Sequence, residues 1–583
     1  MWWRDGVLYQ VYPRSFADSD GDGVGDLRGI IDHLDHLEWL GIDGLWLNPT
    51  FPSPNADWGF DVSDYRGVHP ELGTMDDLDE LVARAGDRGI RVLLDLVPNH
   101  TSDEHPWFGE RREMYVWREG RDGGPPNNWK SLFGGPAWTR DEASGEWYLH
   151  NFDPRQPDLD WWNEDVRAEF DDILRFWFAR GIAGFRIDVA HGIVKDRELR
   201  DNPEATEEDA EHFRRLGQRP VFSMNRPEVH HVLQRWREVS DEHEAILVGE
   251  TYVHDLESLV AFYGQGTDEL HLAFNFVFLL AEFDVEILAP IVARTEELLP
   301  EHAWPVWTIG NHDTARYPTR WCHGDPGLVR CALMLLLTLR GTPVLYYGDE
   351  LTLPETVISP ERVLDPVGLL RDPERPGRDG ARTPMPWSDQ PGAGFTRPGV
   401  EPWLPFGAVS GLDVASQRRA HDSPLRLTRD LVGLRRAEED LRTGEYTELM
   451  AKKDLWVYRR GTGLLVALNL GNEARSVAAR GTIALATRRE RYGESVDGKL
   501  ALGPGEGAVV RLGGARPRGV PSSARGRLAR ARLRATTAPG RSPQNSRWRS
   551  RLTSKPWSVR RSRQVRPAVR DVQVKRPKVR LRP

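Results

Sequence analysis

The sequence predicts an α/β fold: a TIM-type (β/α)8 barrel with an inserted loop domain, followed by a small antiparallel β-sandwich and a basic tail. Three observations carry this prediction: strands and helices alternate, the strands are short and almost continuously apolar, and there are eight of them. Apolar strands alternating with helices are typical of a parallel sheet covered by helices, and eight strands close such a barrel. The expected strands cover residues 7–12, 44–49, 91–97, 184–188, 245–250, 269–274, 305–310 and 342–347.

Helices are expected between these strands. Apolar residues at helical spacing predict helices over Leu27–Leu40 and Met75–Asp87. A glycine closely follows each range, as is common at helix C-termini. A further helix over Leu425–Arg436 is expected to close the barrel, and residues 454–458 and 463–468 are expected to be short strands of the β-sandwich.

Composition excludes several classes of protein. With 583 residues, 39% of them hydrophobic, the chain can form a large core and more than one domain. Two cysteines, Cys322 and Cys331, are too few for a disulfide framework or a cysteine-based zinc site. The N-terminus lacks the features of a signal peptide, and the longest apolar run is too short to span a bilayer. We therefore expect a cytoplasmic protein without a membrane partner.

Charge is divided unevenly along the chain. Residues 515–583 hold 22 lysines and arginines against one acid, Asp571, whereas the preceding residues are strongly acidic. The tail is rich in Arg, Pro, Ser and Ala without apolar periodicity, so residues 514–583 are expected to be disordered. Such a tail could bind a nucleic acid or an anionic surface. It could equally be a solvated extension or the product of a shifted reading frame, and we expect no nucleic-acid partner.

The strand over residues 184–188 ends on a carboxylate. Alternation along a strand places the Arg186 side chain on the same face as Asp188. An arginine beside a carboxylate lowers the carboxylate's pKa and keeps it ionised. An ionised carboxylate at the C-terminal end of a barrel strand suits a nucleophile. The alternative is a structural ion pair at a strand end.

Other polar residues follow the remaining strand ends. We expect them at one mouth of the barrel, because the C-terminal ends of parallel strands share one face. Three carboxylates in one mouth repel one another, so their pKa values separate, and one can act as a general acid while another stays a nucleophile. The residues at this mouth would be Asp61, His100, Asp188, Glu250, His312 and Asp313.

An acidic loop near the N-terminus has the spacing of a calcium-binding loop. Carboxylates stand at loop positions 1, 3, 5 and 9, Gly23 stands at position 6, and a main-chain carbonyl is available at position 7. The twelfth position is Gly29, so the usual bidentate glutamate is missing. The loop predicts a structural Ca²⁺ or Mg²⁺ site, with a plain acidic turn as the alternative. Its ligands would be Asp18, Asp20, Asp22, Val24 and Asp26.

Several stretches, in order along the chain, resemble motifs of the α-amylase family, glycoside hydrolase family 13. Those similar to its signature motifs are QVYPRSF (10–16), DLVPNH (95–100), GFRID (184–188), VGE (248–250) and NHD (311–313), and QPDLD (156–160) resembles the motif of its inserted loop domain. RTPMPW (382–387) is similar to the RTPMQW of the α-glucosidase, oligo-1,6-glucosidase and trehalose synthase branch, with Pro386 in place of glutamine. The resemblance covers residues 1–513.

The resemblance implies a role for each matched residue. Asp188 would be the nucleophile that forms a glycosyl-enzyme, Glu250 the acid/base, and Asp313 the group that holds the 2- and 3-hydroxyls and stabilises the transition state. Such a retaining enzyme keeps its nucleophile and acid/base about 5–5.5 Å apart. Phe60 could stack on the sugar ring or be ordinary core. The non-reducing glucose would be bound by Asp61, His100, Arg186, His312 and Arg382.

The resemblance also divides the chain into domains. Domain A, the barrel, would comprise residues 1–100 and 166–437, and domain B, inserted over 101–165, would wall the active site. Domain C, the β-sandwich, would cover residues 438–513, before the tail. Residues 196–230 are charged and are expected to lengthen the barrel rim.

The activity implied by the resemblance is that of a retaining, exo-acting α-glucosidase without an organic cofactor. It would release glucose from the non-reducing end of short α-1,4- or α-1,6-linked gluco-oligosaccharides. Val189, directly after the nucleophile, is a modest cue for α-1,6 preference, so linkage stays open, as does the oligomeric state. Two alternatives are a trehalose synthase-like isomerase or transglucosidase of the same branch, and a non-catalytic binding homologue, which the intact acids disfavour.

Overall fold

Eight parallel strands form a closed barrel in the computed structural model of the chain, which describes residues 1–209, 211–370 and 377–513. The strands follow one another around the barrel in chain order, and the last pairs with the first. A parallel bridge between Phe274 and Val306 joins β9 to β10 and completes the circle. The predicted barrel is therefore confirmed. Its strands are β1 (Leu8–Val11), β2 (Gly44–Leu47), β3 (Arg91–Leu96), β7 (Gly184–Ile187), β8 (Ile246–Gly249), β9 (Leu272–Ala273), β10 (Val306–Thr308) and β11 (Thr342–Tyr346).

Both faces of the barrel sheet are buried. Leu8, Trp46 and Leu93 belong to one apolar cluster together with residues of β8, β9, β10 and β11, which fills the barrel interior. Their neighbours Tyr9 and Leu45 belong to a second, larger cluster that includes the apolar faces of the surrounding helices. This two-sided burial explains why the strands are almost continuously apolar in sequence.

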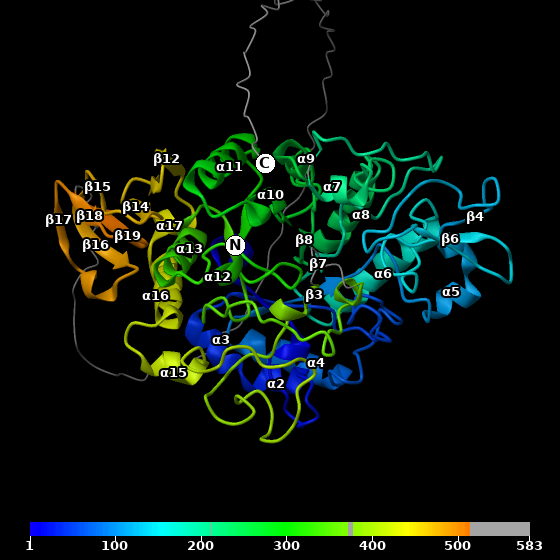
Figure 1. The fold of residues 1–583 in the computed structure, drawn as a ribbon, viewed down its shortest axis with the longest axis horizontal. Helices are drawn as coiled ribbons and strands as arrows, with labels where there is room; N and C mark the ends of the chain where they lie inside the picture. The colour runs from blue at the N-terminus through cyan, green and yellow to red at the C-terminus, as the bar shows by residue number, and fades with distance from the viewer. Residues whose placement is uncertain (210, 371–376, 514–583) are drawn as a thin grey trace, which may run out of the picture. The chain divides into compact units, whose positions relative to one another are not determined.

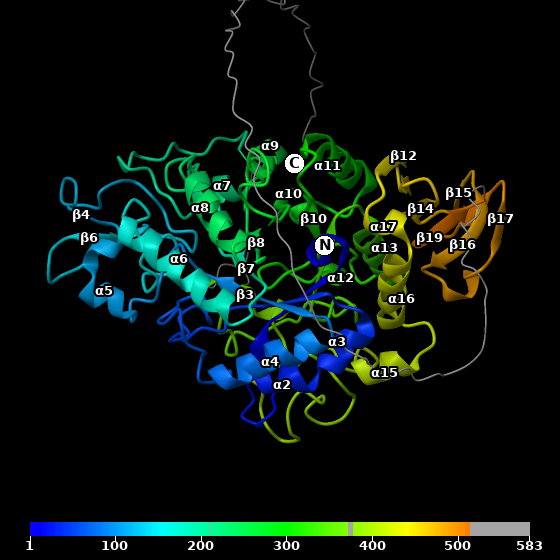
Figure 2. The same ribbon diagram turned by 180° about the vertical axis from the view of Figure 1, so that it is seen from behind.

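Helices surround the barrel strands (Figures 1 and 2). α4 spans Met75–Asp87, as predicted, and starts with a capping box at Thr74. The helix predicted over Leu27–Leu40 is interrupted at His33, whose backbone leaves helical geometry while its Nδ1 lies 2.8 Å from the Gly29 carbonyl oxygen. The other longer helices are α6 (Glu164–Ala179), α8 (Val229–Asp241), α11 (Val285–Leu298), α13 (Pro326–Thr338) and α16 (Pro424–Ala437). Shorter α-helices are α1 (Trp2–Asp5), α2 (Leu27–Asp32), α3 (Leu34–Leu40), α5 (Pro106–Glu110), α7 (Glu211–Leu216), α9 (Leu256–Ala261), α10 (Phe276–Leu280), α12 (Tyr317–Arg320), α14 (Pro366–Leu369), α15 (Val414–Arg419) and α17 (Glu439–Arg442).

The long connection between β3 and β7 carries a small antiparallel sheet. Its strands, in the order β4, β6, β5, are Trp117–Arg118, Trp147–Leu149 and Trp138–Arg140. The charged segment after β7 contacts this insertion, because Asn128 and Asn202 exchange two hydrogen bonds of 2.8 Å. The insertion and this segment together therefore extend the barrel rim.

The C-terminal residues form a six-stranded antiparallel sheet and a two-stranded one. Alternate residues of β13 face opposite sides: Trp456 and Tyr458 join the core shared with the barrel helices, and Val457 packs toward the two-stranded sheet. The Tyr458 hydroxyl lies 2.6 Å from Thr338 Oγ1 of α13. The strands are β12 (Tyr446–Lys452), β13 (Leu455–Arg460), β14 (Leu464–Asn469), β15 (Arg475–Val477), β16 (Arg480–Ala486), β17 (Ser495–Asp497), β18 (Leu500–Leu502) and β19 (Glu506–Leu512).

The predicted disordered tail, residues 514–583, lies outside the described residues. Among the helices of the described part, none is long and apolar enough to span a bilayer.

Candidate active site

Polar side chains gather at the C-terminal ends of the barrel strands. Asp188 directly follows β7, Glu250 directly follows β8, and Asp313 lies in the loop after β10. All three strands run in the same direction, so their ends open on the same mouth of the barrel. The strand-end arrangement expected from the sequence is therefore present for these three acids.

Arg186 joins three carboxylates into one cluster. Its Nη1 lies 2.6 Å from Asp188 Oδ1 and 2.8 Å from Asp95 Oδ1, and its Nη2 lies 2.9 Å from Glu250 Oε2. We call these four residues the Arg186 cluster. Arg186 and Asp188 do share a face of β7, as alternation predicted, and one guanidinium sets the separation of Asp188 from Glu250.

The pKa of Asp188 departs from the expected direction. Burial raises the pKa of Asp188 well above its ordinary value, and the charges of Glu250 and Asp95 raise it further, while Arg186 opposes them. Burial likewise raises the pKa of Asp95 to about 7 against the pull of Arg186. Arg186 does lower the pKa of Asp188, as expected, but the net shift is upward, because one guanidinium cannot offset burial and two neighbouring carboxylates. Asp188 and Asp95 therefore hold a proton more tightly than isolated aspartates do.

The acid/base candidate Glu250 is also held by the main chain. The backbone N–H of Val189 donates a hydrogen bond to Glu250 Oε2 at 2.8 Å. Val189 has a φ of 46°, a left-handed conformation that is rare for a β-branched residue. Such strain costs about 1–3 kcal/mol and persists only where the surroundings impose it. The strained turn after the candidate nucleophile thus aims a donor at the candidate acid.

A second arginine, Arg378, joins another set of carboxylates. Its guanidinium reaches Asp57 Oδ1 at 2.5 Å, Asp365 Oδ1 at 2.5 Å and Asp313 Oδ1 at 3.3 Å. Arg382 Nη2 also reaches Asp313 Oδ1, at 3.1 Å. We call Arg378, Asp57, Asp365, Asp313 and Arg382 the Arg378 cluster. Burial alone would raise the pKa of Asp313, but the positive charges of Arg378 and Arg382 hold it well below its usual range, so Asp313 is ionised.

Two stacked rings, Phe60 and His312, and the buried guanidinium of Arg382 also lie at the mouth. The Phe60 ring stacks on His312 with centroids 5.1 Å apart and an interplanar angle of 3°. Burial lowers the pKa of His312 well below its usual value, so its imidazole is neutral. Arg382 is fully buried, and its Nη1 has no hydrogen-bond partner among the residues that the structure describes. A ligand oxygen in the mouth would supply that acceptor.

Asp61 is not brought to either cluster. Its carboxylate accepts hydrogen bonds from Ser53 Oγ and from the backbone N–H groups of Ala56 and Asp57, at 2.7, 2.7 and 2.9 Å, and it is completely buried. Asp61 therefore shapes its own loop. The carboxylate that this loop presents to the mouth is that of Asp57, whose pKa burial raises to about 6 in spite of Arg378 and Arg382.

Four residues of the two clusters, Asp57, Asp95, Asp365 and Arg378, were not among the site residues predicted from the sequence. Asp57 lies four residues before Asp61 in one loop, and Arg378 lies four residues before Arg382. Charge and position along the chain are alike within each pair, so no sequence signal separates them. Only the turn geometry decides which side chain faces the mouth.

The inserted domain contributes to the same mouth. His100 Nε2 lies 3.1 Å from the Phe60 carbonyl oxygen, and the Gln156 amide lies 3.0 Å from the same imidazole nitrogen. The Gln156 amide also donates to Asp57 Oδ2 at 3.3 Å. Burial lowers the pKa of His100 to about 4, so it is a neutral donor at neutral pH. The positions of His100, Arg186, His312, Arg382 and Phe60 therefore all border the mouth.

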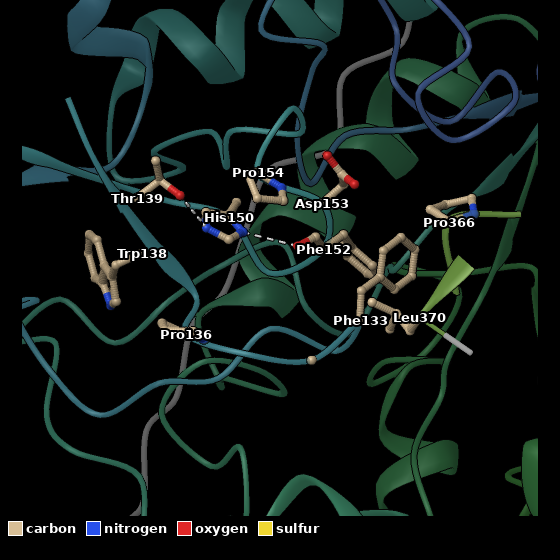
Figure 3. A pocket seen from close by; sticks show the side chains of 11 residues that line it. Phe133, Pro136, Trp138, Thr139, His150, Phe152, Asp153, Pro154, Pro366 and Leu370 are labelled. Carbon is tan, nitrogen blue, oxygen red and sulfur yellow. Dashed lines mark hydrogen bonds between the residues drawn. The ribbon is translucent and has the colours of Figure 1, made fainter. Parts of the chain in front are cut away.

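A cavity of about 230 Å³ adjoins the mouth on the side of the inserted domain (Figure 3). Two of its lining rings also approach residues already described: Phe152 lies 5.1 Å from the His100 ring, and Phe133 lies 5.4 Å from the Arg378 guanidinium of the Arg378 cluster. In Figure 3, Leu370 and Pro366 lie on the same side of the cavity as Phe133, and Trp138 and Thr139 lie on the other side. The two phenylalanines therefore link this cavity to His100 and Arg378.

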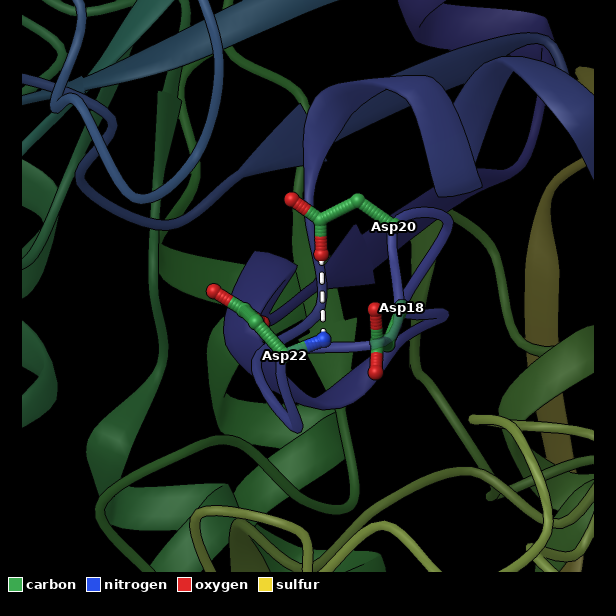
Figure 4. Close-up of side chains that lie close together, drawn as sticks. All are labelled: Asp18, Asp20 and Asp22. Atoms are coloured by element: carbon green, nitrogen blue, oxygen red, sulfur yellow. Dashed lines mark hydrogen bonds between the residues drawn. The ribbon is translucent and has the colours of Figure 1, made fainter.

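The acidic loop brings three of its five predicted ligands together. Oxygen atoms of Asp18, Asp20 and Asp22 lie within 4.8 Å of one another (Figure 4). No lysine or arginine of the described residues forms an ion pair with these three carboxylates, so a divalent cation would supply missing positive charge. Asp26 is used differently, because its Oδ1 accepts from Gly29 N at 2.6 Å and its Oδ2 from Ser19 N at 2.8 Å.

Comparisons with known proteins agree with this geometry. The family model of the alpha amylase catalytic domain matches residues 10–444. A probable alpha-glucosidase of Rhizobium meliloti (strain 1021) is 39% identical over 500 residues, which cover 81% of this chain and 90% of that protein. An oligo-1,6-glucosidase of Heyndrickxia coagulans is 36% identical over 519 residues, which cover 80% and 92%.

Solved structures show the same fold. The alpha-glucosyl transfer enzyme XgtA matches with a TM-score of 0.82 at 37% identity, covering 88% of this chain and 99% of that one. The trehalulose synthase MutB from Pseudomonas mesoacidophila MX-45 matches with a TM-score of 0.80 at 30% identity, covering 88% and 99%. The residues that the family model matches, 10–444, contain both arginine clusters.

Proposed function

Because the chain belongs to the α-amylase family of catalytic domains, we propose that it is a retaining, exo-acting α-glucosidase. It releases glucose from the non-reducing end of short α-1,4- or α-1,6-linked gluco-oligosaccharides. The names of the similar proteins, alpha-glucosidase and oligo-1,6-glucosidase, support this activity. The observation that carries the proposal is the Arg186 cluster, in which a single guanidinium holds Asp188 beside Glu250.

In the first step, a carboxylate oxygen of Asp188 attacks the anomeric carbon. Glu250 gives its proton to the glycosidic oxygen, so the C–O bond breaks, the aglycone leaves, and a glucosyl ester of Asp188 remains. In the second step, the Glu250 carboxylate takes a proton from water, whose oxygen attacks the same carbon and frees Asp188. Two inversions at this carbon retain the α configuration.

The first step requires one proton on the pair of acids, and the Arg186 cluster supports this. Three carboxylates surround one guanidinium, so the cluster carries excess negative charge and favours the binding of a proton. The Val189 N–H and Arg186 Nη2 both contact the same oxygen, Glu250 Oε2. Oε1 of Glu250 is then the atom that would carry the proton to the leaving group.

The Arg378 cluster would bind the glucose that is released. An ionised Asp313 accepts hydrogen bonds from vicinal hydroxyls, and these bonds strengthen as positive charge develops on the ring in the transition state. Asp57 and Arg378 would bind the hydroxyls at the far end of the same ring, with His100 and His312 as neutral partners. In this assignment Asp57 takes the role that the sequence suggested for Asp61.

A transglucosidase or isomerase of the same family is the second candidate. The similarity to an alpha-glucosyl transfer enzyme and to a trehalulose synthase favours it. Both activities use the same glucosyl ester and differ in whether water or a sugar hydroxyl attacks it. The chain retains all the acids that the chemistry needs, so a purely binding role has less support.

We also propose that Asp18, Asp20 and Asp22, with the Val24 carbonyl, hold a structural Ca²⁺ or Mg²⁺. The missing counter-charge at the three carboxylates supports this. A cation there would stabilise the loop before α2 and would take no part in the chemistry. A cytoplasmic location stays a prediction from the sequence.

The test is to identify the products of maltose, isomaltose and trehalose by NMR, with Asp188→Asn as the control. We expect α-glucose to appear before β-glucose from maltose or isomaltose, and no product from the variant. Trehalose or a longer oligosaccharide as main product from maltose would assign the second candidate. Initial β-glucose, or equal turnover by Asp188→Asn, would contradict the retaining mechanism.

A further inference from the structure

A second cavity lies at the opposite end of the barrel from the acids. It has a volume of about 360 Å³ and is lined by residues of α1, of the end of α8, and of the segments that lead into β8, β9 and β10. These segments enter the strands at their N-terminal ends, whereas Asp188, Glu250 and Asp313 follow the C-terminal ends. The volume falls in the range of about 300–1,000 Å³ that is usual for small-molecule sites.

Trp304, a lining residue, has a donor without an acceptor. Its side chain is only 2% exposed, and its Nε1 has no hydrogen-bond partner within the described residues. Buried polar groups in folded proteins are almost always paired, and an unpaired one costs about 1–3 kcal/mol. A ligand oxygen bound in the cavity would supply the missing acceptor.

Arg4, another lining residue, adds a second unused donor group. Its guanidinium lies over the Trp304 ring, 4.2 Å from the centroid. Its Nε is buried and has no partner, and no carboxylate of the described part of the chain forms an ion pair with it. An arginine normally uses its several N–H groups when it is held in place by packing. Here they remain available to a ligand.

One of the two histidines that line the cavity, His271, provides a third donor. His271 Nδ1 accepts a hydrogen bond from Leu247 N at 3.1 Å, so the proton of the neutral ring is on Nε2. This Nε2 lies 4.0 Å from Asp241 Oδ1, too far for a hydrogen bond. The carboxylates of Asp241 and Glu244 border the same cavity and can accept hydrogen bonds.

The hydrogen-bond donors and acceptors that line the cavity indicate which class of ligand it can bind. An apolar molecule would leave the donors of Trp304, Arg4 and His271 unpaired. An anion would meet the donors but would also face the carboxylates of Glu244 and of Asp241, the latter paired with the lining residue Arg237 at 2.7 Å. A neutral polyhydroxylated ring offers both acceptors and donors, and its C–H faces can pack on indole rings such as that of Trp3, which also lines the cavity.

We propose that this cavity is a second, non-catalytic binding site for a neutral sugar, namely glucose or a glucose-terminated oligosaccharide. The choice of glucose rests on the proposed function, because that reaction produces it. The cavity and its unpaired donors do not depend on that function. The site would let product or substrate bind the barrel at the face remote from the reaction.

Hydrogen–deuterium exchange with and without glucose tests the proposal on the full chain. We expect glucose to slow exchange in peptides over residues 241–247, 263–271 and 300–306, in addition to the peptides at the catalytic mouth. Trp304→Phe keeps the ring but removes the N–H, and should weaken binding at this site by about tenfold. Arg4→Met, on the short first helix, should do the same without disturbing the core.

Trp39→Phe is the matched control. Two arginines, Arg418 and Arg429, also lie over the Trp39 ring, at 4.4 and 4.5 Å, but Trp39 lines neither cavity described above. This variant should leave glucose protection of the three segments unchanged. All three variants should retain the maltose-hydrolysing rate of the parent protein.

The outcomes separate this inference from the proposed function. Protection of the catalytic mouth alone would overturn the second site and leave the glucosidase intact. Protection of the three segments by inorganic phosphate but not by glucose would also overturn it, because the ligand would then be an anion. Equal protection in Arg4→Met and the parent would show that the assigned donors do not bind the sugar.

Discussion

Val189 donates its backbone N–H to Glu250 Oε2 at 2.8 Å from a left-handed backbone conformation. The residue that follows the nucleophile therefore fixes the acid/base through its main chain, while its side chain is buried beside the mouth. The same strained turn orients both reacting groups. Strain at this position is part of how the site is built.

The strain at Val189 predicts an unusual order of stability for two variants. Glycine in place of alanine normally destabilises a protein by about 0.5–1 kcal/mol. At a φ of 46° only glycine avoids the steric cost of the left-handed region, about 1 kcal/mol. Val189→Gly should therefore unfold at a higher urea concentration than Val189→Ala. Both variants lose the same buried valine side chain, so a more stable alanine variant would show that this turn is not left-handed.

Asp57 and Asp61 should differ sharply when each is changed to asparagine. Asp57 contacts Arg378 and Gln156 at the mouth, so Asp57→Asn should lower kcat/KM for maltose about 100-fold, or about 2.7 kcal/mol. Asp61 accepts three hydrogen bonds within its own loop, so Asp61→Asn should mainly lower the melting temperature. Steady-state kinetics and thermal unfolding of the two variants make the comparison. An equal loss of kcat/KM in a fully folded Asp61→Asn protein would contradict this assignment.

This contrast shows where sequence reasoning succeeds and where it ends. The barrel, the strand ends and the positions of Asp188 and Glu250 follow from periodicity, because strand direction and alternation determine where these two acids lie. The choice between Asp57 and Asp61 depends on the turn of one loop, and both residues are aspartates in an irregular segment. The break at His33 likewise depends on a local contact with Gly29 that helical periodicity does not reveal.

Electrostatics was the other point that the sequence could not settle. The pairing of Arg186 with Asp188 was predicted, but the net upward shift of the Asp188 pKa was not predicted. The sequence does not show that Asp95 and Glu250 share the same guanidinium, or that burial outweighs its attraction. Reasoning from the Arg186–Asp188 pair alone fails here, because Asp95 and Glu250, which belong to other strand ends, add two further charges to the same guanidinium.

Metal removal tests the acidic loop. If Asp18, Asp20 and Asp22 bind Ca²⁺, a chelator should lower the melting temperature by a few degrees, and added Ca²⁺ should restore it. Asp22→Asn should abolish this response. Asp26→Asn is the control, because Asp26 caps α2 and should lower the melting temperature while preserving the response to Ca²⁺. A chelator that leaves the melting temperature of the parent unchanged would argue for a plain acidic turn.

Asp349, which belongs to neither arginine cluster, should make the stability of the protein depend on pH. Its side chain is buried, and burial raises its pKa to about 7 despite the attraction of Arg316. In the unfolded chain the pKa of an aspartate is about 3.9. Between pH 4 and 7 the folded protein therefore keeps a proton that the unfolded chain has lost. The free energy of unfolding falls as pH rises through this window, by about 4 kcal/mol from this group.

Asp349→Asn should remove that part of the pH dependence. The asparagine oxygen can still accept the 3.0 Å hydrogen bond from Tyr346 N, and the side chain stays neutral at every pH. At pH 4 both proteins carry a neutral group at this position, so urea unfolding there should give similar stabilities. At pH 8 the variant should be the more stable of the two, because the parent alone must hold a buried carboxylate. A variant that is equally destabilised at pH 4 and pH 8 would show instead that residue 349 acts through packing and not through its charge.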